Sequence, residues 1–295
     1  MKIKNLEQEL RHHLDYCMKI ELIKAFTNNP EQGNPAGVIF NADELSQEEM
    51  IKIASELGYS ESVFIVKPLS DEADVRFRFM TATTEVDACG HATLAGAQAI
   101  SEKNPFQTLR VETVAGLVTV ERDTEGSLMM KMAKAELGDK VYDKETIARL
   151  LNIDSNLILD TPIKTASVGS SKLMIHIKNL GTIASISPDF EAMIEFCKVN
   201  PVKGFYVFTT ETINLKAQFH TRQFNPAAGI LEDPTTGVAG GALALYAQAY
   251  NLVSSDEILI EQGYELNKPG EIIIRIRDGA VYVGGNAVKF GTKEL

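Results

Sequence analysis

Several features that would point to particular classes of protein are missing from this sequence. Its 295 residues contain no tryptophan and only three cysteines, at Cys17, Cys89 and Cys197. Because that number is odd and the cysteines are far apart, they argue against a disulfide framework and fit a reducing compartment. No CxxC pair occurs, and no ligand spacing with carboxylates or cysteines is found at His12, His13, His176 and His220, so we expect no metal site.

Long apolar runs and an excess of positive charge are also missing. No stretch reaches the roughly 18 consecutive apolar residues that a transmembrane helix requires. The polar leader, residues 1–18, contains no apolar segment of the kind found in signal peptides. With 40 acidic residues against 29 Lys and Arg, the formal net charge of −11 opposes binding to nucleic acid or anionic lipid. We therefore expect a cytoplasmic protein with neither a nucleic acid nor a membrane as partner.

What the sequence does contain is a repeated pattern. The segments EVDACGHATLAGA (85–97) and EDPTTGVAGGALA (232–244) share identical residues at a constant offset of 147 positions. The identical pairs include Glu85 and Glu232, Gly90 and Gly237, Ala92 and Ala239, and Ala97 and Ala244. A chain of this length, with 44% hydrophobic residues, can bury the cores of two domains. Since the offset is half of the chain, we expect two related halves.

The sequence also predicts where strands and helices lie. The predicted strands cover residues 20–26, 36–40, 63–66 and 75–80. Ser46, with Glu49 three residues later, predicts a capping box for a helix that ends at Leu57. Asp143 would lead a further helix within residues 137–151.

Two more helices are predicted in the repeated segments. Residues 90–100 and 237–250 are small or apolar around the whole helix circumference, which predicts helices buried on every side. Strand, polar loop, buried helix and further strands therefore occur twice. We predict an α+β fold with two pseudo-symmetric halves, each a sheet wrapped around a central buried helix, and an active site in the cleft between them.

The predicted boundaries follow from this repeat. A polar extension covers residues 1–18, the first half covers residues 19–135, and the second half covers residues 136–280. The C-terminal strand, within residues 281–295, is expected to return to the first half.

The starts of the two buried helices are candidate anion sites. Free backbone N–H groups and the helix dipole attract a carboxylate at such a start, and glycine allows a close approach. Gly90 and Gly237 stand where the helices begin, and Thr236 could cap the second one. The alternative is that these small residues only let buried helices pack against the sheets. Neither segment is a dinucleotide fingerprint or a phosphate-binding loop, so no nucleotide cofactor is expected.

Three titratable residues are candidates for acid and base chemistry. Glu61 lies at the mouth of an apolar strand, where a poorly solvated carboxylate could transfer a proton near neutral pH. His91, in the first turn of a buried helix, could exchange one hydrogen bond with a substrate. Asp233, just before the second helix, could orient a substrate amine or hydroxyl. The alternatives are a solvated strand-start glutamate, a structural histidine, and a turn carboxylate before Pro234.

Cys89 adjoins a helix start, where a thiolate is favoured, so a thiol-dependent racemase is an alternative function. Such chemistry needs a second acid on the opposite face of the substrate, and the matching position holds Thr236. We therefore interpret Cys89 as a packing residue.

Seven segments of the sequence resemble those of a known protein family. The segments GNPAGVIF (33–40), SESVFIV (60–66), CGHATLAGA (89–97), ETVAGLVTV (112–120), EDPTTGVAGGALA (232–244), QGYELNKPGEI (262–272) and VYVGGNAVKFG (281–291) resemble the phenazine-biosynthesis PhzF-like family. The resemblance runs from about residue 19 to the C-terminus. It implies a diaminopimelate-epimerase-like fold, a cofactor-free isomerase and, commonly, a homodimer.

The resemblance also implies roles for single residues. In the phenazine enzyme a glutamate moves a proton on dihydro-hydroxyanthranilate, and that glutamate corresponds to Glu61. The family's histidine and aspartate at the substrate correspond to His91 and Asp233. The substrate carboxylate would rest on backbone amides near Gly90 and Gly237. The remaining predicted substrate-binding residues are Ser60, Thr236 and Val238.

Val238 departs from the family pattern, because the phenazine enzyme has a serine there. The phenazine substrate is therefore not implied for this chain. The sequence predicts an isomerase that moves a proton on a small carboxylate-bearing substrate, without cofactor or metal. The alternatives are the thiol-dependent racemase and a protein of the same fold that binds small acids without chemistry.

Overall fold

The computed structural model describes residues 18–132 and 135–294, and the strand and helix order repeats along the chain. The first repeat contains β1 (Lys19–Ala25), β2 (Asn34–Ile39), η1 (Ala42–Glu44), α2 (Gln47–Leu57), β3 (Ser62–Val66), β4 (Val75–Met80), β5 (Glu85–Val86), α3 (Gly90–Lys103), β6 (Thr108–Thr113), β7 (Gly116–Arg122) and β8 (Leu128–Lys131). None of the helices in the described residues is long and apolar enough to cross a membrane.

The second repeat begins after a short strand, β9 (Glu136–Leu137). It contains α4 (Lys144–Leu151), η2 (Ser155–Leu157), β10 (Lys164–Ser167), β11 (Lys172–His176), α5 (Leu180–Ser185), α6 (Phe190–Val199), β12 (Phe205–Thr209), β13 (Phe219–Asn225), η3 (Pro226–Ala228), β14 (Ile230–Asp233), α7 (Gly237–Ala249), β15 (Glu257–Gln262), η4 (Tyr264–Leu266), β16 (Gly270–Arg277) and β17 (Ala280–Gly285). The last strand is β18 (Ala287–Glu294).

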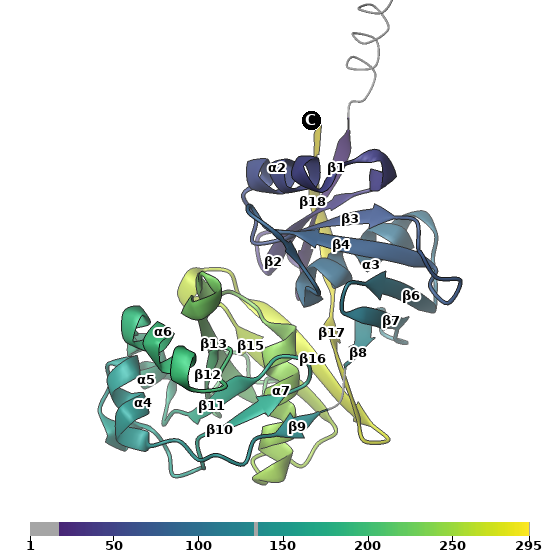
Figure 1. Ribbon diagram of the computed structural model, residues 1–295. Coiled ribbons are helices and arrows are strands. Elements are labelled where there is room, and N and C mark those ends of the chain that lie inside the picture. Colours follow the sequence, from purple (N-terminus) through teal and green to yellow (C-terminus); the bar gives the residue numbers. More distant parts are fainter. Residues whose placement is uncertain (1–17, 133–134, 295) are drawn as a thin grey trace, which may run out of the picture.

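Strand pairing is the same in the two repeats. In the first repeat β1 pairs antiparallel with β2, β2 pairs parallel with β3, and β3 pairs antiparallel with β4. Strands β10 to β13 of the second repeat pair in the same sequence of directions. β4 then pairs antiparallel with β5 and parallel with β6, as β13 does with β14 and β15. Figure 1 shows the two lobes that result, with α3 in one and α7 in the other. The domain boundaries predicted from the sequence remain predictions.

The C-terminal strand connects the ends of the chain. β18 pairs antiparallel with β1 along its length, from Lys19 opposite Glu294 to Ala25 opposite Ala287. β17 instead pairs with β16 of the second repeat and with β8 of the first. The segment expected to form one returning strand is therefore divided into two, and only its second part lies beside β1 (Figure 1).

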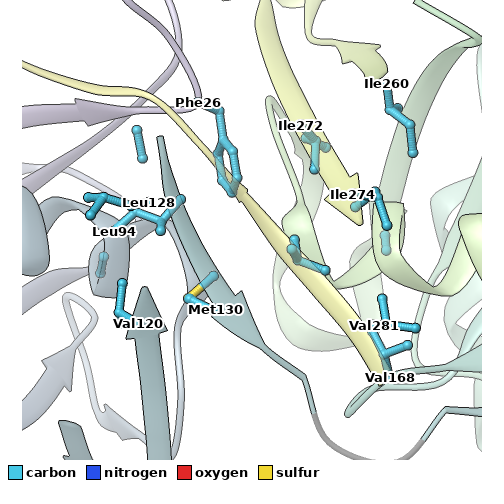
Figure 2. Close-up of a cluster of buried hydrophobic side chains, with 14 of the residues drawn as sticks. Phe26, Leu94, Val120, Leu128, Met130, Val168, Ile260, Ile272, Ile274 and Val281 are labelled. Carbon is cyan, nitrogen blue, oxygen red and sulfur yellow. The ribbon is translucent and has the colours of Figure 1, made fainter. Parts of the chain in front are cut away.

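Helices α3 and α7 are buried because their surfaces are small and apolar on every side. Each helix packs against the strands of its own repeat, and both belong to one hydrophobic cluster that joins the repeats. Figure 2 shows Leu94 of α3 and Leu128 of β8 in this cluster together with Ile272 and Val281 of the second repeat. Each fully buried aliphatic side chain contributes about 1.5 to 3 kcal/mol, so the shared cluster stabilises the two repeats as one core.

The predicted helix starts of α2 and α4 are confirmed. Ser46 accepts the Glu49 amide hydrogen at 3.2 Å, and the Glu49 carboxylate accepts the Ser46 amide hydrogen at 2.8 Å, which is a capping box. Asp143 caps α4 by accepting the Thr146 amide hydrogen at 2.8 Å. Such local side-chain contacts are fixed by spacing along the chain, which is why the sequence predicts them.

A duplicated ion pair precedes each buried helix. Arg78 of β4 binds Glu85 of β5 through two hydrogen bonds of 2.9 and 2.7 Å. Arg222 of β13 binds Glu232 of β14 through two hydrogen bonds of 2.8 Å each. The repeated glutamates of the sequence therefore have the same task in both repeats, because each fixes the hairpin that leads into a helix start.

His220 of β13 is at the centre of a buried ionic network. Its Nδ1 lies 2.7 Å from Oε1 of Glu261, and its Nε2 lies 2.9 Å from Oε1 of Glu265. Glu261 also accepts the amide hydrogens of Ile213 and Asn214 at 2.7 Å each. Burial lowers the pKa of His220, but the hydrogen bonds to both glutamates outweigh burial and raise it to about 9.

Candidate active site

Glu61 and His91 meet at the start of α3. Glu61 immediately precedes β3, and His91 is the second residue of α3. Oε2 of Glu61 lies 3.7 Å from Nε2 of His91, and their side chains are 14% and 7% exposed. Among the described residues, the buried Nε2 atom of His91 has no hydrogen-bond partner. A buried polar atom of this kind is costly without a partner, so it marks a position at which a ligand could bind.

Asp233 comes to the same place from the second repeat. It ends β14, and its carboxylate accepts hydrogen bonds from Nδ2 of Asn34 at 3.1 Å and from the Thr236 hydroxyl. Burial raises the pKa of Asp233, and the Glu61 carboxylate adds to this, while His91 and the Thr236 hydrogen bond lower it. The field of Asp233 therefore reaches both residues of the first repeat. The three residues predicted to be catalytic are brought together across the two repeats.

The turn between Asp233 and α7 differs from the prediction in one respect. Thr236 occupies the N-cap position of α7, but its side chain caps no backbone amide. The capping prediction was wrong, because the Thr236 hydroxyl donates to the Asp233 carboxylate instead. The side chain of Gln262 binds two backbone groups of this turn instead. Its Oε1 accepts the Thr236 amide hydrogen at 3.3 Å, and its Nε2 donates to the Asp233 carbonyl at 2.7 Å. The turn is therefore held by a side chain from β15.

Cys89 lies beside His91 but is a poor thiolate. Its Sγ is 3.3 Å from Nδ1 of His91. Burial raises the pKa of the Cys89 thiol well above its usual range, and the Glu61 carboxylate raises it further. A thiol that stays protonated at neutral pH is a weak nucleophile and a weak base. The arrangement therefore favours carboxylate chemistry at Glu61 over thiol chemistry at Cys89.

Three of these side chains are close enough together to hold a cation. Ligand atoms of Glu61, Cys89 and His91 all lie within 4.8 Å of one another. The sequence spacing gave no sign of this group, because Glu61 is far from the other two along the chain. A zinc-type site would need the Cys89 thiol to lose its proton, against the effect of burial. The expectation of no metal therefore remains a prediction.

A cavity of about 730 Å³ adjoins the start of α3 and lies between the repeats. The first repeat contributes Cys89, Gly90 and the strand ends of β6, β7 and β8, and the second contributes residues 168–170 and Val238. Gly90 and Val238, two of the predicted substrate-binding residues, line it. Ligand atoms of Glu61 and His91 lie within 4.8 Å of Cys89, but neither these two residues nor Asp233 line the cavity. The cavity therefore leads to the site without enclosing it.

The other predicted substrate-binding residues differ in their surroundings. Ser60 is exposed in the loop before β3. Gly237 is buried, and a Cβ atom there would lie 2.8 Å from Cζ of Phe26 and 2.9 Å from Cγ1 of Val283. At Gly90 a Cβ atom would meet only Cε of Met130, at 3.6 Å. Packing therefore requires a glycine at Gly237, whereas at Gly90 it leaves room for a ligand.

Asn34 and Gln262 were not predicted from the sequence. Asn34 of β2 is 1% exposed and donates both to Asp233 and to the Thr235 carbonyl, at 3.1 and 3.2 Å. Gln262 is fully buried and also accepts a hydrogen bond from the Tyr206 hydroxyl at 3.1 Å. Both residues lie in segments that carry the family resemblance. Asn34 is the first residue of β2 and Gln262 the last of β15, so their place in the family segments was the signal that could have marked them.

Comparison with known sequences identifies relatives over nearly the whole chain. A sequence model of the family described as phenazine biosynthesis-like protein matches residues 23–292. A protein of Clostridium acetobutylicum named as an uncharacterized isomerase is 37% identical, with 92% of this chain and 96% of the relative aligned. The trans-2,3-dihydro-3-hydroxyanthranilate isomerase of Pseudomonas aeruginosa is 29% identical, with 91% of this chain and 96% of the relative aligned.

Comparison with solved structures confirms the predicted fold. The Bacillus anthracis phenazine biosynthesis protein of the PhzF family superposes with a TM-score of 0.85 at 29% identity, covering 94% of this chain and 98% of that one. A hydroxyproline epimerase from Agrobacterium vitis superposes with a TM-score of 0.62 at 11% identity, covering 94% and 90%. The second likeness concerns the fold alone, and it agrees with the epimerase-like fold that the family resemblance implied.

Proposed function

The chain belongs to the phenazine biosynthesis-like protein family, whose relatives are named as isomerases, and we propose that it moves a proton on a small carboxylate-bearing substrate without a cofactor. The observation that carries this proposal is the 3.7 Å approach of Glu61 to His91 at the start of α3, within the field of Asp233 from the other repeat. A carboxylate, an imidazole and a second carboxylate in one partly enclosed place are suited to acid and base catalysis.

Glu61 would act first as base and then as acid. Its side chain is 14% exposed, so its carboxylate keeps some access to solvent while most of it is shielded from water. It would remove a proton from a carbon of the substrate and return it to another carbon, which leaves the enzyme unchanged after one turnover. His91 would donate or accept one hydrogen bond through Nε2, and Asp233 would orient a polar group of the substrate.

The start of α3 would hold the substrate carboxylate. The first N–H groups of a helix have no intrahelical acceptor, and the dipole there favours an anion. Gly90 lines the cavity and leaves space for such a group. Val238 has no hydroxyl to offer at the position where the phenazine enzyme has a serine, so this position would give the substrate no side-chain hydrogen bond.

Incubation with a panel of small carboxylates in deuterated water tests the proposal. The wild-type protein should incorporate deuterium into its substrate, detected by mass spectrometry and NMR. Glu61→Gln should lower the incorporation rate by at least about 100-fold while the fold is kept, because loss of a general base removes a factor of this order. Glu56→Gln, which changes an exposed glutamate of α2, is the matched control. A Glu61→Gln protein of full activity would refute the role of Glu61.

The two alternatives give different results in the same assay. A thiol-dependent racemase would lose its activity in Cys89→Ala, although the raised pKa of this thiol disfavours that mechanism. A protein that only binds small acids would show affinity without incorporation of deuterium. We further propose a cytoplasmic homodimer, from the resemblance and the composition, and light scattering of the purified protein measures its oligomeric state.

A further inference from the structure

Lys172 is a buried cation without a carboxylate partner. It begins β11, is 5% exposed, and takes part in no ion pair with any of the described residues. Its Nζ donates to Oγ of Ser170 at 3.0 Å and to the Lys203 carbonyl at 2.7 Å. Burying an ammonium group against neutral partners alone is costly, because its charge is taken out of water without compensation. Such a cation is suited to a ligand that brings the missing charge.

The contact to Ser170 connects Lys172 with the substrate cavity. Ser170 lines the cavity together with Val168 and Gly169, opposite the start of α3. Since its Oγ accepts a hydrogen from Lys172, the hydroxyl hydrogen of Ser170 remains free to donate. The hydroxyl therefore offers a donor at the cavity wall that is backed by a positive charge. Donors supported in this way bind anions more strongly than neutral hydroxyls do.

The residues around Lys172 leave space for its side chain inside the protein. Gly204 adopts a φ of +137°, and a Cβ atom there would lie 3.2 Å from Cδ of Lys172 and 2.7 Å from Nε2 of Gln223. Gln223 is 1% exposed, pairs with Asp233 in the sheet, and keeps its Oε1 without a hydrogen-bond partner among the described residues. Lys172 thus lies in a buried polar group on the second-repeat side of the active site.

The electrostatics agree with this position. Burial lowers the pKa of Lys172 to about 8, the Asp233 carboxylate opposes this, and Lys203 adds to it. The charge of Lys172 is therefore felt at Asp233, within the site, and an anion in the cavity would stabilise the ammonium form.

We propose that Ser170 and Lys172 form a second anion subsite, so that the substrate carries a further carboxylate or comparable anionic group besides the one held at the start of α3. This inference rests on the proposed function for the first carboxylate and extends it to a class of substrate, the small diacids. The first repeat would hold one end of the substrate and the second repeat the other, with the proton transferred between them at Glu61.

Matched pairs of acids test the subsite directly by calorimetry. Malonate, succinate and glutarate are compared with propionate, butyrate and valerate, which have the same chain lengths but one carboxylate less. The best dicarboxylate should bind the wild-type protein about tenfold more tightly than its monocarboxylate partner, as one charge-assisted contact implies. Equal affinities within every pair, or no binding of any dicarboxylate, would overturn the proposal.

Variants assign the preference to the subsite. Lys172→Met removes the charge at similar length and should bring the ratio to about one, and exchange of a buried charge for an apolar side chain commonly preserves folding. Ser170→Ala keeps the buried lysine and should lower the ratio of dicarboxylate to monocarboxylate affinity. This variant therefore provides the test if Lys172→Met does not fold. Lys131→Met is the control, because Lys131 is exposed and lines the same cavity. A ratio lost in Lys131→Met and kept in Lys172→Met would contradict the assignment.

The same measurement on Glu61→Gln separates this inference from the proposed function. Binding of a dicarboxylate does not require proton transfer, so the affinity ratio should persist in Glu61→Gln. A persistent ratio in a protein that exchanges no deuterium with any acid would refute the isomerase and leave the subsite intact. A ratio of one in a protein that exchanges deuterium into monocarboxylates would refute the subsite and leave the isomerase intact.

Discussion

The network around His220 makes the stability of the fold dependent on pH. The pKa of His220 rises from 6.5 to about 9 in the folded protein, and each pKa unit corresponds to about 1.36 kcal/mol. The protonated histidine therefore contributes roughly 3 kcal/mol to the free energy of unfolding. Because the folded-state pKa is raised, this contribution is fully present below the unfolded value of 6.5. It is lost as the pH rises through about 9.

His220→Gln removes the titrating group, because glutamine has no proton to lose in this range. We expect the difference in unfolding free energy between wild type and variant to shrink by roughly 3 kcal/mol between about pH 6 and about pH 10. Urea unfolding at a series of pH values, followed by circular dichroism and tyrosine fluorescence, measures this difference. Coincidence of the two signals checks that a single transition is observed.

Lys172 also titrates in this pH range, so the quantity to compare is the difference in unfolding free energy between wild type and His220→Gln, and not the wild-type curve alone. The folded-state pKa of Lys172, about 8, lies below the usual lysine value of 10.5, so its contribution to stability rises with pH over an overlapping range and opposes that of His220. Both proteins contain Lys172, so this effect cancels. His176→Gln is a matched control, since burial lowers the pKa of His176 to about 4 and its difference should stay flat above about pH 7. Parallel curves for wild type and His220→Gln would refute the role assigned to the network.

Three further predictions concern the active site and the buried helices. Cys89→Ala should keep deuterium exchange within about twofold of wild type, since the buried thiol stays protonated, and loss of exchange would favour the thiol mechanism. Gly96→Ala should lower the free energy of unfolding by about 1 to 3 kcal/mol, because its Cβ atom would lie 2.8 Å from Cε2 of Phe77; Gly181→Ala, with ordinary contacts only, is the control, and equal stabilities would contradict the packing argument. Dialysis against EDTA should leave exchange unchanged, and activity restored only by added zinc would establish a metal at Glu61, Cys89 and His91.

The parts of the structure that the sequence predicts are those governed by local spacing. The cap at Ser46 and the buried helices that begin at Gly90 and Gly237 depend on residues within a few positions of one another. The repeat adds long-range information, because a second copy of a helix start indicates that both copies serve one cleft. This is why His91 and Asp233, one in each repeated segment, could be assigned to a common site before their positions were known, whereas Glu61 lies outside the repeated segments and was added by the family resemblance.

The remaining contacts depend on strand register, which local spacing does not determine. Asn34 donates to Asp233 across 199 positions of sequence, and no pattern near either residue predicts that pairing. The burial of Lys172 is equally unexpected, since lysine is usually exposed, and the space beside Gly204 that admits its side chain is formed only by the fold. Competition between neighbours also decides outcomes, as when Thr236 donates to Asp233 and leaves its helix uncapped.

The position of β18 has a consequence for synthesis on the ribosome. β1 is the first strand of the described chain to emerge, yet one of its two neighbours, β18, is the last. Until β18 has been synthesised, β1 has an open edge of unpaired backbone groups, which is a template for pairing with other chains. We expect the nascent first repeat to be vulnerable to aggregation and to be protected only when the final strand closes the sheet.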